Sequence, residues 1–273
     1  MVTMSLFVLL SQPQRSNDSE KIVKKWIDII LALDISYSME ADDFPPNRLV
    51  VAKQVLSWFI EELESDRVGM VVFAGMPFTA VPLTFDYAIF QDILQRTETT
   101  SIQQAVPGLQ GTAIGDAILS SLQILEKWRS DEQAREQVLI LVTDGAANQW
   151  VEPRAAAAMA KEQWVRIYTI GVGSEQWGFI TQQTAFGTRR QQVEGVDEPT
   201  LRALATITDG QYRRAVDARS FQQIVEELKK LQRHELEIEQ HRLYKPLYWP
   251  FVLIAVCGVV LLRIQEKRRK IAE

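Results

Sequence analysis

The strongest constraint on the fold is a near-continuous apolar run, WIDIILALDIS (residues 26–36), that ends abruptly in polar residues. Such a run is typical of a central strand in a parallel sheet that is covered on both faces. Further strands are expected at 68–73, 138–142, 167–172 and 211–214, and helices at 47–64, 85–95, 113–128, 154–163, 199–206 and 220–241. This alternation predicts an α/β fold: a doubly wound, mostly parallel sheet flanked by helices. Residues 178–195 interrupt it and are expected to form a hairpin around Phe186 and Gly187.

Composition narrows the functional classes. Hydrophobic residues make up 47% and charged residues 24% of the chain, as in ordinary globular proteins. The formal net charge is −5 and no basic face is visible, so nucleic acid is not an expected partner. The single cysteine, Cys257, allows neither a disulfide framework nor a cysteine-based zinc site.

The C-terminal region carries an uncharged run, Leu247–Leu262, that would extend about 24 Å as a helix against a hydrocarbon core of about 30 Å. Flanking aromatic and basic side chains favour a transmembrane helix over a buried core helix. We therefore expect five segments: an apolar stub and linker (1–20, a possible remnant of a membrane span), the α/β domain (21–230), a helical stalk (231–245), the transmembrane helix (246–264) and a basic tail (265–273).

Orientation in the membrane is predicted from the basic tail, which favours a cytoplasmic C-terminus and a domain on the other side. The N-terminal sequence MVTMSLFVLLSQPQ conflicts with this, because it lacks a basic leading region and a clear cleavage site for export.

Five oxygen-bearing side chains stand at element boundaries. Asp34, Ser36 and Ser38 follow the first strand, Thr112 lies where a glycine turn opens a helix, and Asp144 ends the strand VLILVT. The carboxyl ends of parallel strands meet at one edge of the sheet, where ligands collect. Each piece alone could be a helix cap or an Asx-turn. Together they predict an all-oxygen site for Mg²⁺ or Mn²⁺, with a water position open to a carboxylate from a partner.

The motifs that carry this site resemble the von Willebrand factor A (VWA) superfamily and its bacterial membrane-bound aerotolerance-operon (BatA-type) subfamily. The resemblance runs from Lys25 to Leu262 and rests on DIILALDISYSMEADDFPPNRLVVAK, DRVGMVVFAG, PLTFDY, GTAIGDAI, LVTDG and YTIGVG. It implies a metal-ion-dependent adhesion site with direct metal contacts from Ser36, Ser38 and Thr112. Asp34 and Asp144 would act through water and hydrogen bonds, and Tyr37 stands where the family commonly has glycine.

The resemblance implies a protein that is not an enzyme and that binds a partner in a membrane-associated assembly linked to stress tolerance. It places the protein in the cell (inner) membrane with the VWA domain outside the cytoplasm. A protein that supplies a carboxylate, including a related VWA membrane protein, is the expected partner.

Two other functions compete with metal-dependent binding. A metal-dependent phosphohydrolase of the haloacid-dehalogenase type needs a second Asp two residues after the first, where this chain has Ser36. A membrane scaffold with a vestigial site would lack affinity for metal. Two features near the site stay open: the acidic loop of Glu40, Asp42 and Asp43 either is solvated or modulates the approach of a partner, and Trp150 either lines the rim or packs inside.

Overall fold

The protein is described here by a computed structural model. It describes residues 14–22, 27–63, 66–102, 104, 106, 109–129, 136–145, 151–174, 177–184, 187–215, 238–246 and 249–272. The chain forms two compact units, one spanning Lys25–Glu235 and the other made of the two ends of the chain.

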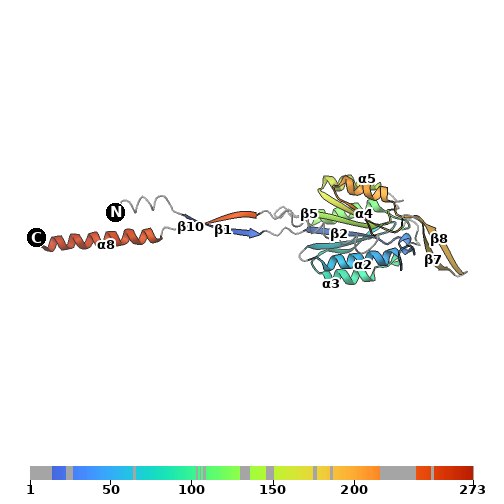
Figure 1. The fold of residues 1–273 in the computed structure, drawn as a ribbon, viewed down its shortest axis with the longest axis horizontal. Helices are drawn as coiled ribbons and strands as arrows, with labels where there is room; N and C mark the ends of the chain where they lie inside the picture. The colour runs from blue at the N-terminus through green and yellow to red at the C-terminus, as the bar shows by residue number, and fades with distance from the viewer. Residues whose placement is uncertain are drawn as a thin grey trace. The chain divides into compact units, whose positions relative to one another are not determined.

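The larger unit is built on a six-stranded sheet of order β4-β3-β2-β5-β6-β9 (Figure 1). Every neighbouring pair is parallel except β3 and β4. The strands are β2 (Ile27–Asp34), β3 (Arg67–Phe73), β4 (Pro77–Thr84), β5 (Glu136–Thr143), β6 (Val165–Val172) and β9 (Tyr212–Ala215). The helices are α2 (Arg48–Glu61), α3 (Tyr87–Arg96), α4 (Ile114–Lys127), α5 (Pro153–Glu162) and α6 (Glu198–Ile207), with 3-10 turns η1 (Tyr37–Glu40) and η2 (Thr99–Ser101). The α/β fold expected from the sequence is confirmed.

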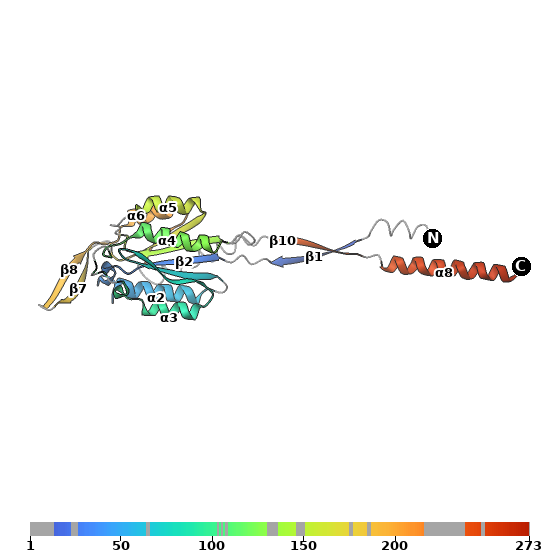
Figure 2. The same ribbon diagram turned by 180° about the vertical axis from the view of Figure 1, so that it is seen from behind.

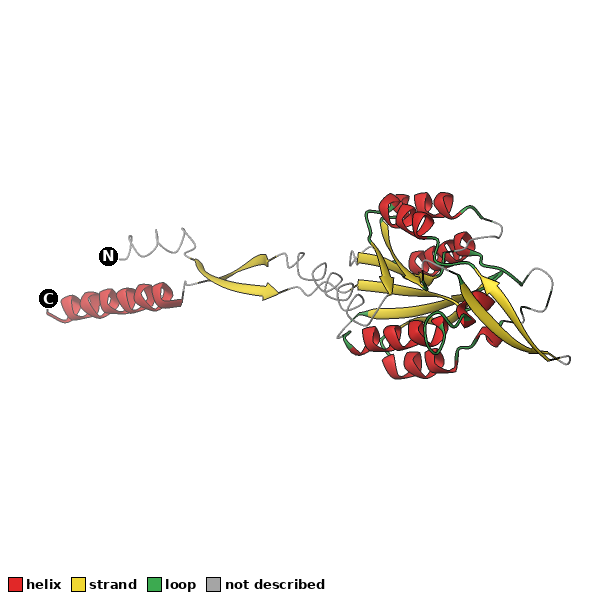
Figure 3. Ribbon diagram, turned by 45° about the vertical axis from the view of Figure 1, so that its right-hand side comes forward, coloured by secondary structure: helices red, strands yellow, loops and turns green. Residues whose placement is uncertain are grey.

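Helices cover both faces of this sheet (Figure 3). Alternate residues of β2 point to opposite faces, as strand geometry requires. Leu31 and Leu33 pack in a core with α2 and α3, whereas Ile30 and Ala32 pack in a second core with α4, α5 and α6. Burial on both faces explains why β2 is apolar almost without interruption.

The order of the strands reverses beside β2. The chain passes from β2 to β3 on one side and later returns to β5 on the other, so β2 lies between them. In open α/β sheets the carboxyl ends of the strands at such a reversal border a ligand-binding crevice. Figure 2 shows this end of the sheet on the side from which β7 and β8 project.

Strand β4 was not expected from the sequence. It contains Pro77 and Pro82, which a central strand does not tolerate because proline has no backbone N–H to donate. Here β4 is an edge strand that pairs antiparallel with β3 through shifted registers, where the missing donors are accommodated.

The interruption at residues 178–195 forms a separate two-stranded sheet, β7 (Gly178–Thr184) and β8 (Gly187–Val193). The two strands are antiparallel, with Gly178 opposite Val193 and Thr184 opposite Gly187. The expected hairpin is therefore confirmed.

The smaller unit corrects one expectation. Strand β1 (Gln14–Ile22) pairs antiparallel with β10 (Ile238–Pro246), and helix α8 (Trp249–Ala272) follows. The helical stalk predicted for 231–245 is therefore wrong from residue 238 onward, because pairing with β1 satisfies the extended backbone of this segment. Residues 231–237 lie outside the described residues.

The predicted transmembrane helix at 246–264 falls largely on α8. Within the part of the chain that the structure describes, no helix is both long enough and apolar enough to cross a membrane, so the prediction of a span is not supported. The uncharged run stops at Leu262, and charged residues follow in the rest of α8.

The central position of β2 gives a direct test of the packing. Leu31 is fully buried, whereas Ile89 on α3 is 54% exposed. We expect Leu31→Ala to lower the free energy of unfolding by about 2–5 kcal/mol through lost burial and a residual cavity. Ile89→Ala, the matched control, should change it by less than about 1 kcal/mol. Denaturant titrations measure both values, and equal effects would contradict this core assignment.

Candidate metal centre

The loop that follows β2 brings three of the predicted residues together. The Asp34 carboxylate accepts hydrogen bonds from the Ser36 backbone N–H (2.8 Å) and from the Thr143 hydroxyl (2.5 Å). The Ser36 and Ser38 hydroxyl oxygens lie 3.0 Å apart. Asp34 is therefore fixed by the loop that follows β2 and by the end of β5, and the two serine oxygens lie side by side in that loop.

A buried glutamine braces this loop. The side-chain oxygen of Gln104 accepts the Tyr37 backbone N–H (3.2 Å), and its amide nitrogen donates to the carbonyls of Ile35 (2.8 Å) and Thr99 (2.9 Å). The Thr99 hydroxyl in turn donates to the Glu40 carboxylate. These bonds hold the backbone between Asp34 and Ser38 without using the serine hydroxyls.

Thr112 reaches the same edge through a close approach of two loops. Gly75 permits it, since a Cβ there would lie 2.4 Å from the Gln110 carbonyl oxygen. The Ala113 N–H then donates to the carbonyl of Ala74, just past the end of β3 (2.7 Å). Thr112 is buried at this junction, and α4 begins two residues later.

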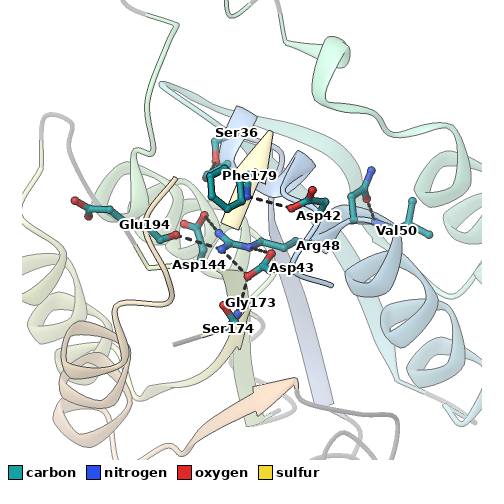
Figure 4. Close-up of polar contacts among 12 residues, drawn as sticks. Ser36, Asp42, Asp43, Arg48, Val50, Asp144, Gly173, Ser174, Phe179 and Glu194 are labelled. Atoms are coloured by element: carbon teal, nitrogen blue, oxygen red, sulfur yellow. Dashed lines mark hydrogen bonds and ion pairs between the residues drawn. The ribbon is translucent and has the colours of Figure 1, made fainter. Parts of the chain in front are cut away.

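Asp144 follows β5 and is held by a buried arginine (Figure 4). The Arg48 guanidinium donates to the Asp144 carboxylate at 3.0 Å and to both oxygens of Asp43 at 2.8 Å. Gly145, with a φ of +86°, turns the chain directly after Asp144. The Arg48 side chain is fully buried, so its charge acts in a medium of low dielectric.

The same arginine reaches the hairpin. Arg48 donates to the carbonyl of Glu194 (3.2 Å), just after β8, and Asp43 accepts the N–H of Ser174 (2.7 Å), before β7. Gly173 leaves room for the guanidinium, because a Cβ there would lie 2.8 Å from Nε of Arg48. One ion network therefore joins Asp144, the acidic loop and both ends of the hairpin (Figure 4).

The pKa values of two buried carboxyls, Asp34 and Asp43, are shifted in opposite directions. Desolvation, together with the charge of Asp144, raises the pKa of Asp34 from 3.8 to about 7, against the hydrogen bonds from Ser36 and Thr143. Burial alone would also raise the pKa of Asp43, but hydrogen bonds from Arg48 and Ser174 outweigh it and hold that pKa below its usual value. Asp34 and Asp144, the two carboxyls of the predicted site, thus repel each other when both are charged. A cation between them would relieve this repulsion.

The residues present fit a hard divalent cation. The predicted set offers only oxygen donors: carboxylates from Asp34 and Asp144 and hydroxyls from Ser36, Ser38 and Thr112. The described residues contain no cluster of three or more His, Cys, Asp or Glu with metal-ligand geometry, so a site of that kind is not seen in them. A cation here would depend on the hydroxyls.

The comparison with known families decides the classification. A sequence model of the von Willebrand factor type A domain matches residues 28–230. The chain belongs to the von Willebrand factor type A family.

Relatives of this VWA protein include aerotolerance-related proteins. BatB from Bacteroides thetaiotaomicron is 30% identical, with a TM-score of 0.65 over 76% of this chain and 99% of that chain. An aerotolerance-related membrane protein from Bacteroides fragilis is 28% identical, with a TM-score of 0.64 over 74% of this chain and 97% of that chain. An uncharacterised protein from Borreliella burgdorferi is 27% identical over 98% of this chain and 76% of its own length. A UPF0353 protein from Nocardia farcinica is 29% identical over 71% of this chain. The match spans only 59% of that protein's length.

Two more distant VWA structures share the fold alone. They are the mussel byssus proximal thread matrix protein 1 with a zinc-occupied metal-ion-dependent adhesion site (18% identity, TM-score 0.54, 77% of this chain and 47% of that chain) and the manganese-loaded Plasmodium vivax TRAP protein (17% identity, TM-score 0.54, 81% of this chain and 78% of that chain).

Sequence reasoning missed the residues that support the VWA site. Arg48 was placed only in a helix, while Thr143 and Gln104 carried no signal, because each acts through a partner distant in sequence. Of the two interpretations of the acidic loop, solvation does not hold for Asp43, which pairs with buried Arg48. Trp150 lies outside the described residues.

Removal of the buried guanidinium should be costly. Arg48→Met leaves the Asp43 and Asp144 carboxylates without their counter-ion, and we expect the free energy of unfolding to fall by about 3–5 kcal/mol. The control is Arg96→Met, which breaks an exposed pair with Asp92 and should cost less than about 1 kcal/mol. Denaturant unfolding measures both, and a loss of under 1 kcal/mol for Arg48→Met would contradict the role of the network.

The raised pKa of Asp34 predicts how stability depends on pH without metal. Between pH 3.8 and about 7 the folded chain keeps a proton on Asp34 that the unfolded chain releases. The free energy of unfolding in EDTA should therefore fall as pH rises through this range and level off above it.

Asp34→Asn provides the comparison for this pH dependence, because an amide cannot ionise. Denaturant titrations in EDTA at several pH values give the free energy of unfolding of both chains. As pH rises, the parent chain should lose stability relative to Asp34→Asn. A difference that stays constant with pH would show that the pKa of Asp34 is not raised.

Proposed function

We propose that this VWA protein binds one divalent cation, Mg²⁺ or Mn²⁺, and through it a carboxylate of a protein partner. Ser36, Ser38 and Thr112 would contact the cation directly, and Asp34 and Asp144 would act through water and hydrogen bonds. The observation that carries the proposal is the pair of serine hydroxyls 3.0 Å apart beside a carboxylate fixed between β2 and β5.

The charge balance of the site favours a partner carboxylate. Neutral hydroxyls leave much of the cation's charge uncompensated, and Arg48 offsets part of the negative charge of Asp144. A bound cation would therefore supply an electrophilic position for an acidic side chain from outside. Two VWA proteins of the same fold are named for zinc or manganese, which supports a divalent ion.

Binding is favoured over catalysis. VWA domains are in general interaction domains, and the position that a haloacid-dehalogenase-type enzyme would fill with a second Asp holds Ser36. Exposed Tyr37, which stands between Ser36 and Ser38 in the sequence, would offer apolar contact to a partner.

We place the protein in a membrane-associated assembly, as the name of the Bacteroides fragilis relative supports. The basic C-terminal sequence favours a cytoplasmic tail and a VWA domain outside the cytoplasm. Related VWA membrane proteins are candidate partners in an assembly linked to stress tolerance.

Metal affinity tests this proposal. Ligand binding stabilises a folded chain by RT ln(1 + [L]/Kd), about 2.7 kcal/mol at a hundredfold excess over Kd. Titration calorimetry with Mg²⁺ or Mn²⁺ should give one site per chain, and Ser36→Ala/Ser38→Ala should abolish it.

Ser57→Ala is the matched control, since the Ser57 hydroxyl on α2 donates to the side chain of Gln91 on α3 and belongs to no candidate ligand. It should bind metal like the parent chain. If the parent chain binds neither ion, the site is vestigial and the membrane-scaffold alternative gains the support.

A further inference from the structure

The β7–β8 hairpin, residues 178–193, is a basic element in an acidic chain. Its sequence contains Arg189 and Arg190 and no Asp or Glu, although the whole chain has a net charge of −5. The residues from Gly187 to Gln192 are all exposed. A two-stranded hairpin is at best marginally stable by itself, so this element depends on what holds its base.

The base of the hairpin is tied to the loop that follows the candidate metal residues. The Asp42 backbone N–H donates to the Phe179 carbonyl (3.0 Å), and the Phe179 N–H donates to the Asp42 carboxylate (3.2 Å). Ile180 is buried. The Arg48 and Asp43 network holds Glu194 and Ser174 on either side, and the same guanidinium holds Asp144. The hairpin is thus fixed to the metal centre at its base.

Arg190 shows where the positive charge lies. Its guanidinium stacks 4.2 Å from the centre of the Phe179 ring and pairs with Asp42 at 3.2 Å. That pair is exposed, with side chains 60% and 47% accessible, so it contributes little and can exchange for another carboxylate. Neighbouring strand residues point to opposite faces, and Arg189 therefore extends the basic surface to the other face.

We propose that the β7–β8 hairpin is a recognition arm that binds a second acidic side chain of the partner whose first carboxylate binds the metal. The inference rests on the proposed function and deepens it: the partner segment is extended and carries at least two carboxylates. A cation at the site and a basic arm anchored beside it are both complementary to such a segment. Two arginines are too few for nucleic acid, whose binding needs many phosphate contacts.

The probes are blocked, fluorescent peptides on a glycine background. One has a single Glu, and three others have a second Glu two, four or six residues from the first, a reach of about 7–20 Å. Fluorescence anisotropy with the full 273-residue chain in Mn²⁺ or in EDTA measures affinity. At least one two-Glu peptide should bind more tightly than the single-Glu peptide, and only in Mn²⁺.

The variant that tests the arm is Arg189→Gln/Arg190→Gln. It should weaken binding of the preferred two-Glu peptide by about three- to tenfold. The affinities for the single-Glu peptide and for Mn²⁺ should stay unchanged. The matched control, Lys127→Gln/Lys161→Gln, removes the same charge at the C-terminal ends of α4 and α5, about 20 Å and about 12 Å along the two helices from their N-terminal ends. The control should bind like the parent chain.

The outcomes separate the two proposals. Single-Glu binding that needs Mn²⁺, with no gain from a second Glu and no effect of the arginine changes, overturns the arm and leaves the metal function intact. No metal-dependent binding of any peptide overturns the proposed function. Peptide binding that needs the arginines but not Mn²⁺ overturns the claim that one partner segment binds both the metal and the hairpin. Self-association in sedimentation that Arg189→Gln/Arg190→Gln abolishes, without peptide binding, makes the occupant a second copy and also overturns the proposal.

Discussion

The buried guanidinium of Arg48 is the interaction on which the candidate site depends. It lies at the start of α2, yet it compensates the charge of Asp144 at the end of β5 and of Asp43 in the preceding loop. A fully buried cation is tolerated only where paired carboxylates and carbonyls surround it. Asp43, Asp144 and Glu194 come from three distant segments. Because one guanidinium donates hydrogen bonds to all three, Arg48 fixes their relative positions.

The Arg48 network also bears on how the candidate metal centre, which is rich in neutral hydroxyls, would tolerate two neighbouring carboxylates. Burial raises the pKa of Asp34, and the negative charge of Asp144 raises it further, so the two carboxylates disfavour each other when both are charged. Arg48 stabilises the charged form of Asp144 by donating a hydrogen bond to it. Hydrogen bonds from Ser36 and Thr143 stabilise the charged form of Asp34. The hydroxyl oxygens of Ser36 and Ser38 lie 3.0 Å apart in the loop that follows Asp34, and such oxygen donors suit a hard cation.

The sequence predicts the layered fold because its signals are local and strong. The apolar run of β2 and the helical spacing of apolar residues in α2 each predict their element from a short stretch of sequence. Strand β4 was missed because its two prolines are acceptable only at an edge, and edge position is a property of the whole sheet. Strand β10 was missed for a similar reason, since its partner β1 comes from the other end of the chain.

The candidate ligands were predictable in the same way, because each stands where a strand or turn ends. Their supports were not. Gln104 and Arg48 act across loops and strands, and nothing in their neighbours signals that role.

The most direct measurement is anomalous diffraction from crystals of the chain grown with Mn²⁺. The account predicts one strong peak about 2.1 Å from the hydroxyl oxygens of Ser36, Ser38 and Thr112, with Asp34 and Asp144 behind them. A peak elsewhere, or none at these residues under saturating Mn²⁺, would contradict the assignment of this edge of the sheet as a metal centre.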